Sequence, residues 1–396
     1  MQFDTPNNSR GPGPNYPAGS GSAMTLLMIL YCIIFYLLIF QSQPAEAWGS
    51  DGHEIVGNIA YSRLTTEAKA AITSILNKGA QFSIEQKKQA HKISNKMSPL
   101  ANVATWADKV RYTKAWHWTA PLHFIDVEDK TYEHGCHYEA LPDKNSRNAG
   151  ADIDHLSNAE TCHFIYERDC KNDFCVAGAI ANYSTIFGQE YNDDKFVIYK
   201  EKRHLRSPQV EQNIVSRDIG LAKNSTYLLV DSLMFITHFI GDIHQPLHCS
   251  RKSDKGGNSF KVHFEVHSEE KHKWSLHSVW DTGIIVKSVQ EMFNNSRDAF
   301  EDEILRLIET EYADLIDTWL SCSDGRDKLC TTKWGEESFE DALRYSYMSE
   351  TGAEIVDNST ISFEYYKSRL PIVQQRLALA GVRLAGTLEL LLSQGI

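Results

Sequence analysis

The stretch His238-Phe-Ile-Gly-Asp242-Ile-His-Gln-Pro-Leu-His248 combines an apolar helix pattern with side chains that bind metal ions. Apolar residues at helical spacing continue upstream of it, which predicts one buried helix. His238 and Asp242 are four residues apart and therefore project from one helix face. Pro246 ends the helix and turns the chain, so that His248 faces a different direction. The motif thus offers three potential metal ligands on one otherwise apolar element.

A second pair of the same kind lies about thirty residues further on, where His277 and Asp281 repeat the four-residue spacing in Leu-His-Ser-Val-Trp-Asp. A core histidine bonded to an aspartate would explain one such pair. Two pairs together with His248 favour a metal site, because histidine and carboxylate ligands at short spacing are typical of zinc proteins.

Length and charge limit the class of protein. The chain has 396 residues, 42% of them hydrophobic, and a net charge of -12. It is long enough for one large domain or two. The acidic balance argues against a non-specific binder of duplex DNA, which needs a basic face. An enzyme that acts on phosphates remains possible, because bound cations supply positive charge locally.

The N-terminal segment indicates the secretory route. Residues 1–23 are rich in Gly, Pro, Asn and Ser and are predicted to be disordered. Residues 24–40 form an uncharged apolar run, followed by Ala45-Glu46-Ala47, the small-x-small pattern of a signal-peptidase site. Cleavage there would make Trp48 the first residue. The alternative is an uncleaved membrane anchor. A cleavable signal peptide normally has a basic flank before its apolar run, and Arg10 is the one basic residue there.

Cysteines and glycosylation sequons fit that route. The short spacings of Cys170 with Cys175 and of Cys322 with Cys330 predict local disulfides, although Cys162 bridging to one of the late cysteines is an alternative. Asn-x-Ser/Thr sequons that predict a glycosylated surface occur at Asn182, Asn224, Asn294 and Asn358.

Helical spacing recurs along the rest of the chain. Helices are predicted after Trp48, over 64–77 with Thr65 or Thr66 as the cap, over 102–111, over 296–320, and over 370–392 with Pro371 in the first turn. The alternation over 121–126 predicts an extended segment, and that over 260–266 a small hairpin with the segment before His277.

Several motifs occur in one fixed order: a processed N-terminal Trp48, Trp-Ala-Asp108, Pro-Leu-His123-Phe-Ile-Asp126, the central motif, Gly-Gly-Asn258 and Leu-His-x-Val-Trp-Asp281. Together they resemble the secreted zinc-dependent single-strand-specific nucleases of plants and fungi, also called bifunctional nucleases. The resemblance runs from Trp48 to the C-terminus. It implies a mainly α fold, a single multi-helix domain of the phospholipase C/nuclease type over 48–396, with a small β-hairpin.

The resemblance also implies three zinc ions in one cleft. Carried over residue by residue, one ion would have the ligands Asp108, His123, His238 and Asp242. A second would be bound by the amine and carbonyl of Trp48, by His53 and by the shared Asp242. The third would be bound by His248, His277 and Asp281. Nitrogen-rich ligands with a few carboxylates suit zinc better than magnesium or calcium.

The implied reaction is hydrolysis of single-stranded DNA and RNA to 5′-mononucleotides, with 3′-nucleotidase activity, by a protein that is expected to be monomeric. Asp242 would bridge two ions, Asp126 is a candidate to orient or deprotonate the attacking water, and Arg111 would stabilise charge on the phosphate. Phe124 is a candidate stacking platform for a base. Asp173 and Asn258 are candidates to read a base edge.

Some positions depart from the family pattern. The stretch 130–161 is longer than usual and would either reshape substrate access or form a mobile loop. Ser275 replaces the usual Asn before Leu-His. Cys249 directly after His248 is unusual, and one hypothesis pairs it with Cys136. His244 lies within the central motif without an assigned ion and is interpreted as a structural residue or a neighbour of the ligands.

Two other functions compete with the nuclease. A zinc phospholipase C shares the fold and the three-ion site. A non-enzymatic zinc-stabilised protein, secreted or tethered to a membrane, would bind the metal without catalysing a reaction. The nucleotide-type motifs and Asp173 favour the nuclease over the lipase, and the complete ligand set argues against loss of activity. The protein itself is expected in the extracellular space or in the lumen of the secretory pathway or vacuole.

Overall fold

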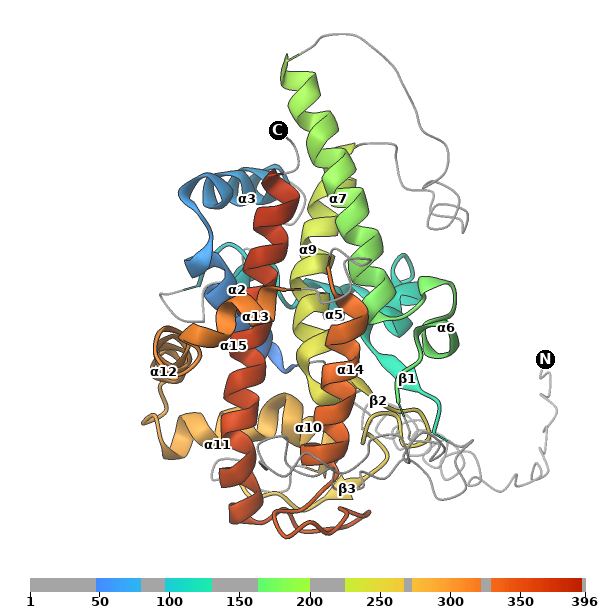
Figure 1. Cartoon of the computed structure of the whole chain (residues 1–396), viewed down its shortest axis with the longest axis vertical. Helices are drawn as coiled ribbons and strands as arrows, with labels where there is room; N and C mark the ends of the chain where they lie inside the picture. Colours follow the sequence, from blue (N-terminus) through green and yellow to red (C-terminus); the bar gives the residue numbers. More distant parts are fainter. Residues whose placement is uncertain are drawn as a thin grey trace, which may run out of the picture. The chain divides into compact units, whose positions relative to one another are not determined.

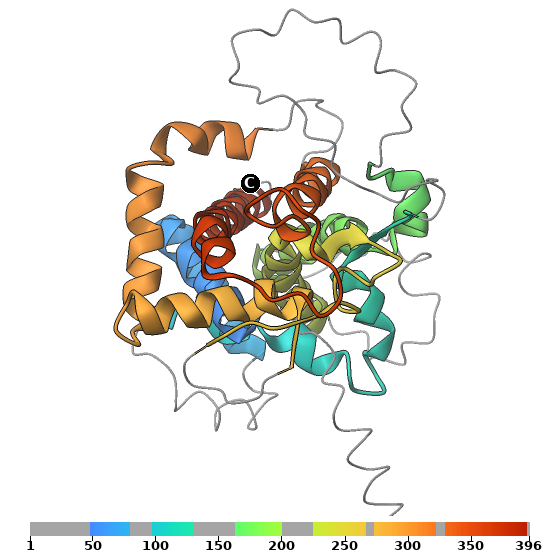
Figure 2. The ribbon, with the colours of Figure 1, turned by 90° about the horizontal axis from the view of Figure 1, so that it is seen from below.

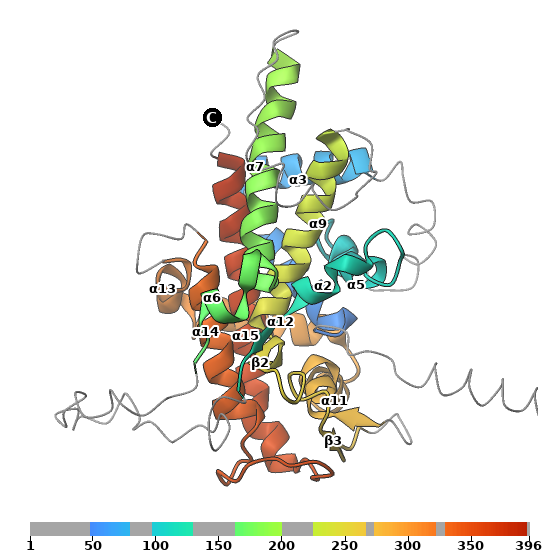
Figure 3. The ribbon, with the colours of Figure 1, turned by 90° about the vertical axis from the view of Figure 1, so that its right-hand side faces the viewer.

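The helix that the central motif predicts is α9 (Ser225–His244). Figures 1 and 3 show it side by side with α7 (Val176–Tyr199). Tyr183 of α7 stacks on Phe235 of α9 with ring centroids 4.5 Å apart. Residues 232–250 are all buried. Because α9 is buried from Ser232 onward, the polar side chains of this part have to find partners inside the protein.

The N-terminal part supplies the next helices, of which the first two were predicted, whereas the predicted helix over 102–111 is divided into two short ones and the last was not predicted. They are α2 (Ser50–Arg63) and α3 (Thr66–Gly79), followed by η3 (Ala101–Val103), α5 (Trp106–Val110) and η4 (His117–His123). The hydroxyl of Thr65 accepts from the backbone N–H of Ala68 at 3.2 Å and so caps α3, one of the two residues predicted for this role.

The C-terminal part packs along the other side of α9. Helices α14 (Thr331–Asp341) and α15 (Phe363–Ser393) both contact α9, and α15 also runs along α2. Figure 2 shows three helices that follow one another around the outside of α2 and α15: α11 (Ile284–Glu291), α12 (Arg297–Glu309) and α13 (Ile316–Leu320). The 3-10 turn η9 (Ala313–Leu315) precedes α13, and the π-turn η10 (Ala342–Ser346) follows α14.

The C-terminal end of α9 is capped by side chains from α14 and α15. Arg376 donates from Nε to the carbonyl oxygen of His244 at 2.8 Å, and the hydroxyl of Ser338 donates to the carbonyl oxygen of Ile243. The last carbonyls of a helix have no partner within the helix. Arg376 therefore satisfies a carbonyl that would otherwise be buried without a hydrogen bond, and Ser338 gives Ile243 a stronger partner than the Cys249 thiol.

Strands are few and short. β1 (Ile125–Val127) pairs in parallel with β2 (Cys249–Arg251), and β3 (Lys261–Val262) pairs antiparallel with β4 (Trp274–Ser275). The second pair is the predicted hairpin, whereas nothing in the sequence predicted the first. The remaining short elements are α6 (Tyr166–Asp169), η6 (Lys171–Asp173), η7 (Pro246–His248), α10 (Leu276–Ser278) and η8 (Val279–Gly283).

The predicted mainly α fold with a small hairpin is confirmed, with three corrections to its elements. Residues 117–123 form a 3-10 helix, and the chain becomes extended after His123. Helical residues over 296–320 divide into α12 and α13, with a bend at which Tyr312 packs on Trp319. α15 begins at Phe363 and holds Pro371 in its interior, because Ser362 caps it by accepting from the backbone N–H of Tyr365 at 2.9 Å.

The computed structural model describes residues 48–79, 97–129, 163–199, 225–266, 273–321 and 329–393. These residues belong to the unit Ala45–Ile396, and the second unit, Met1–Pro44, lies outside them. The predicted tail 1–23, leader or anchor 24–47 and insertion 130–161 therefore stay predictions. Among the described helices, none is long and apolar enough to cross a membrane.

Candidate metal centre

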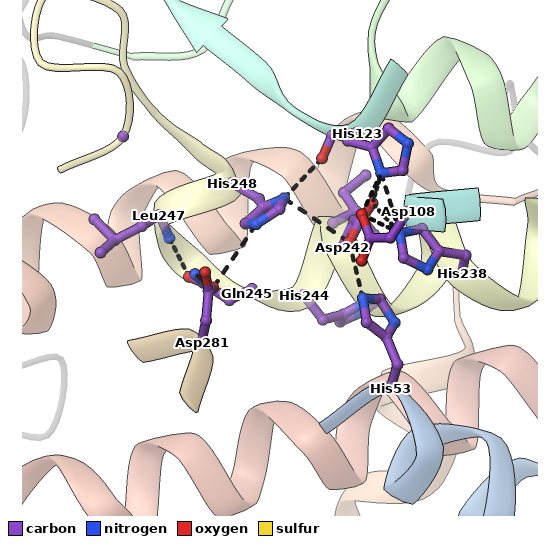
Figure 4. A network of polar contacts seen from close by, with 12 residues as sticks. His53, Asp108, His123, His238, Asp242, His244, Gln245, Leu247, His248 and Asp281 are labelled. Atoms are coloured by element: carbon purple, nitrogen blue, oxygen red, sulfur yellow. Dashed lines mark hydrogen bonds and ion pairs between the residues drawn. The ribbon is translucent and has the colours of Figure 1, made fainter. Parts of the chain in front are cut away.

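Four side chains from three elements meet around the ligand face of α9 (Figure 4). His238 and Asp242 come from α9, Asp108 from α5, and His123 from the end of η4. All four are buried. Nδ1 of His238 lies 2.6 Å from the carbonyl oxygen of Ala104, to which it donates, so that Nε2 presents its lone pair to the cluster.

The spacing of these ligand atoms fits a tetrahedral zinc site. Nε2 of His238 is 3.0 Å from Nδ1 of His123, and these two nitrogens are 3.2 and 2.9 Å from Oδ2 of Asp242. Oδ1 of Asp108 is 3.5 and 3.6 Å from the same nitrogens. Zinc with bonds of about 2.0–2.1 Å to tetrahedral ligands separates them by about 3.3 Å. The cluster therefore has the size of a zinc coordination sphere.

The other oxygen of Asp242 belongs to a second group. Nε2 of His53 lies 3.2 Å from Oδ1 of Asp242, and the His53 ring stacks on that of His238. The His53 ring also lies directly against Gly241, where an added Cβ would be 2.7 Å from Nδ1. Neither nitrogen of this buried ring has a hydrogen-bond partner among the described residues. A cation shared with Asp242 would satisfy Nε2, the nitrogen that faces Oδ1.

The third group consists of His248, His277 and Asp281. Nδ1 of His248 is 2.7 Å from the carbonyl oxygen of His123, and Nδ1 of His277 is 2.6 Å from that of Gly256. Both Nδ1–H groups are thereby used, and the two Nε2 lone pairs face each other at 3.2 Å. Oδ2 of Asp281 is 3.2 Å from Nε2 of His277. Two lone pairs and a carboxylate in this arrangement repel one another unless a cation lies between them.

One neighbour of the third group was missed in the sequence. Gln245 is fully buried, donates from its amide to Oδ1 of Asp281, and accepts from the backbone N–H of Leu247 at 2.6 Å. The amide thus orients the carboxylate through Oδ1, while Oδ2 faces His277. Gln245 lies inside the central motif, and this position was the one feature of the sequence that could have identified it as a neighbour of the ligands.

Burial leaves most of the histidines neutral, which is the form that binds metals. Burial lowers the pKa of His123 to about 4 and that of His277 to about 3, and it also lowers the pKa of His53 and His248. His238 differs: burial opposes its protonation, but Asp242 and Asp108 raise its pKa to about 10. Carboxylates buried this deeply need positive charge, whether from a proton or from a metal ion.

The three groups overlap with the predicted ligand sets, except that His238, rather than Trp48, accompanies His53 and Asp242. The structure brings together Asp108, His123 and His238, then His53, His238 and Asp242, and finally His248, His277 and Asp281. Of the nine predicted ligands, Trp48 is the one that is not among these groups. Its side chain is fully buried, and the next residue, Gly49, donates its N–H to the carbonyl oxygen of Asp281 at 2.9 Å. A cavity of about 240 Å³ opens there, lined by Gly49, Ser50, Asp51, Asp281, Thr282 and Ile285.

Arg111 and Asp126 occupy different surroundings. Nη2 of Arg111 is 3.2 Å from Oδ1 of Asp108, as their predicted common face requires, and it donates to the exposed Tyr112 hydroxyl at 3.1 Å. Asp126 lies on β1, shortly after His123 at the end of η4. Burial raises the pKa of Asp126 to about 6, and the nearby Lys252 partly offsets this rise. Arg111 is thus next to a ligand, whereas the described contacts do not link Asp126 directly to the three groups.

The predicted base-binding residues lie on three separate segments. Phe124 is half-buried, and its carbonyl oxygen accepts from the N–H of Val176 at 3.2 Å, directly after the disulfide loop that carries Asp173. Asp173 is exposed and accepts from the Tyr166 hydroxyl at 2.9 Å. Asn258 is half-buried, and its amide donates to the carbonyl oxygen of Lys255 at 2.9 Å, within its own turn.

The cysteines confirm one pairing and correct another. Cys170 and Cys175 form the predicted disulfide. Cys249 is buried and free, so the hypothesis that it pairs with Cys136 is wrong; its Sγ lies 3.7 Å from the carbonyl oxygen of Ile243 instead. Cys330 is disulfide-bonded, but Cys322 lies outside the described residues, and that pairing stays a prediction.

The remaining predictions concern the surface and His244. Asn294 and Asn358 are exposed, Asn182 is half-buried, and Asn224 lies outside the described residues. His244 has a structural place, since Nδ1 donates to the carbonyl oxygen of Ile240 at 2.7 Å and Nε2 lies 3.0 Å from Nη1 of Arg383. It belongs to none of the three metal-ligand groups among the described residues.

Comparison with known proteins gives consistent matches over nearly the whole chain. The S1/P1 Nuclease family model matches residues 48–393. Endonuclease 2 of Arabidopsis thaliana is 30% identical over 92% of this chain and 97% of its own length. Endonuclease 4 of the same plant is 30% identical over 88% of this chain and 90% of its own. Nuclease S1 of Aspergillus oryzae is 27% identical over 89% of this chain and 94% of its own.

Proposed function

The chain belongs to the S1/P1 nuclease family, and we propose that it is a secreted endonuclease that uses three zinc ions to hydrolyse single-stranded DNA and RNA to 5′-mononucleotides, with 3′-nucleotidase activity. The observation that carries this proposal is the set of three buried His/Asp groups, two of which are joined through the two oxygens of Asp242. Such a pair of groups is what two-metal phosphoesterases require.

The ligand assignment follows the three groups. Asp108, His123, His238 and Asp242 would hold one ion, Trp48, His53 and Asp242 the second, and His248, His277 and Asp281 the third. When bound, zinc lowers the pKa of a water molecule and stabilises negative charge on a phosphate. The tautomers support this assignment, because hydrogen bonds to backbone carbonyls direct the Nε2 atoms of His238, His248 and His277 into their clusters.

The residues of the chain complete the reaction. Arg111, held beside Asp108, would bind a phosphate oxygen and stabilise the charge that develops on it. Asp126, with its pKa raised to about 6, would orient or deprotonate the attacking water. Phe124 would stack on a base, and Asp173 would read its edge from the adjacent disulfide loop. Asn258 is the weaker candidate for that reading, because its amide is already hydrogen-bonded within its turn.

We further propose that the protein is a monomer that is secreted or retained in the lumen of the secretory pathway or vacuole. The family match begins at Trp48, which is also the residue that follows the predicted cleavage site. If the segment before Trp48 is not removed, the same domain would be tethered to a membrane.

An assay of the released products tests this function. The mature protein should release 5′-mononucleotides from single-stranded RNA and DNA and phosphate from 3′-nucleotides, each abolished by a chelator and restored by zinc. Metal analysis should give about three zinc ions per chain from the three ligand groups. Release of choline phosphate from phosphatidylcholine, without nucleotides, would identify a phospholipase C instead. No product of either kind would favour a non-enzymatic zinc protein.

A further inference from the structure

The loop that follows β2 holds one ligand of the third group. The carbonyl oxygen of Gly256 accepts from Nδ1 of His277 at 2.6 Å. Around it, Lys255, Gly256 and Gly257 have φ angles of 57°, 61° and 76°. Non-glycine residues seldom adopt this left-handed backbone, so a lysine within such a run needs contacts that keep the loop in place.

Asp254 provides those contacts. Its Oδ1 accepts from the backbone N–H of Gly257 at 2.7 Å and from the Tyr347 hydroxyl at 2.9 Å. Its own carbonyl oxygen accepts from the N–H of Ser259 at 3.0 Å. Asp254 is buried, so water does not compete for these bonds. The carboxylate therefore fixes the turn in which Gly256 lies.

Tyr347 connects this loop to the strand that follows His248. Its hydroxyl accepts from Ser250 at 3.0 Å while it donates to Asp254. Ser250 lies two residues after His248, on β2. The ring is fully buried and is covered by the Arg251 guanidinium at 4.0 Å. One hydroxyl thus joins the segment after His248 to the loop that orients His277.

We infer that Tyr347 and Asp254 are positioning residues that set the zinc affinity of the third group, His248, His277 and Asp281. The carbonyl of Gly256 fixes the tautomer and the direction of His277, and Asp254 with Tyr347 holds that carbonyl. Loss of such an outer hydrogen bond typically weakens metal binding by about 10- to 100-fold. The inference rests on the proposed function, because it takes the third group to be a zinc site.

The test is the substitution Tyr347→Phe, which removes one oxygen atom and keeps the ring. Zinc per chain is measured after equilibration in buffers of graded free zinc, for the wild type and the variant. We expect one of the variant's three ions to require higher free zinc than in the wild type, by at most about 10-fold, which is the lower end of what a direct hydrogen-bond partner of a ligand contributes. The other two ions should bind as in the wild type. Tyr61→Phe is the control, because it also removes a tyrosine hydroxyl that is hydrogen-bonded. Its partner is the hydroxyl of Thr73, and the bond joins α2 to α3. It should leave all three affinities unchanged.

The outcomes separate the inference from the function. Three ions bound by Tyr347→Phe with the affinities of the wild type would overturn the inference alone. So would simultaneous loss of all three, which indicates general damage to the fold. If Tyr347→Phe does not fold, Asp254→Asn, which weakens the same acceptor, should release the same single ion to a smaller extent, and its failure to do so overturns the inference. A wild type without zinc overturns the proposed function as well.

Discussion

The imidazole ring of His53 lies flat against that of His238, with centroids 3.9 Å apart and planes inclined by 17°. Despite this contact the two rings face different oxygens of Asp242. Nε2 of His53 is 3.2 Å from Oδ1, and Nε2 of His238 is 3.2 Å from Oδ2. One carboxylate therefore determines the separation of two adjacent ligand groups, and it does so from the rigid, buried helix α9.

Replacement of Asp242 by Asn should remove most activity. The amide nitrogen carries no charge and no available lone pair, so at least one of the two groups loses its shared ligand. We expect nuclease activity to fall by more than the roughly 100-fold that marks loss of an outer-shell partner, with fewer zinc ions per chain. Asp231→Asn is the matched control, because Asp231 is a half-buried aspartate on the same helix. Equal, small effects of both changes would mean that Asp242 is not shared.

Gly241→Ala tests the packing that lets His53 reach Asp242. The added Cβ would be 2.7 Å from Nδ1 and 2.9 Å from Cε1 of His53, so that the ring has to move. We expect loss of the ion that His53 and Asp242 share, and with it most activity. Gly188→Ala is the control, because nothing lies within 4 Å of the new Cβ. This variant should bind zinc normally, and its free energy of unfolding should rise by up to about 1 kcal/mol, because alanine favours helix α7 more than glycine does. Full zinc content in Gly241→Ala would contradict this account.

The pH profile should reveal Asp126. Burial raises its pKa to about 6. A carboxyl group accepts a proton only when ionised, so kcat/KM on single-stranded RNA should fall about tenfold per pH unit below pH 6. Asp126→Asn should be less active at pH 7 but should lose this acidic limb. Zinc content measured at each pH separates the effect from metal loss. An unchanged limb in the variant would assign it to another group.

Processing at Ala47 should control activity. In the uncut chain the nitrogen of Trp48 is an amide and cannot act as an amine ligand. A protein with residues left before Trp48 should therefore lack one zinc ion and most activity, and removal of a cleavable tag should restore both. The same tag placed at the C-terminus is the control. N-terminal sequencing of secreted material should begin Trp-Gly-Ser-Asp-Gly-His. Fully active protein that begins near Met1 would show that the leader is an anchor and that Trp48 is not a ligand.

The sequence predicted those parts of the fold and site that depend on local patterns. Helix α9 and its ligand face follow from spacing within twenty residues, and so does the hairpin of β3 and β4. The parallel pairing of β1 with β2 joins Ile125 to Cys249, which are far apart in the sequence, so it depends on tertiary packing that no local pattern reports. The start of α15 was misplaced because Pro371 was taken as a first-turn residue, whereas Ser362 caps the helix two turns earlier.

Neighbours that act on a ligand from far along the chain could not be predicted. Tyr347 lies 93 residues from Asp254 and bonds to it across the fold. No periodicity joins two such positions, and a buried tyrosine resembles any other core residue in sequence. Gln245 was within reach of a prediction, because it lies inside the motif, but its amide is directed toward Asp281 by a turn that the sequence does not specify.

The cap of α9 has a consequence for the order in which the protein matures during synthesis. All predicted ligands have been translated once Asp281 is added, yet Arg376 and Ser338, which close the end of the helix that bears Asp242, follow later. A nascent chain that has just completed its predicted ligands therefore still lacks the two side chains that cap α9. A chain truncated before α15 would therefore carry every predicted ligand but would leave the carbonyl oxygen of His244 without its hydrogen bond from Arg376.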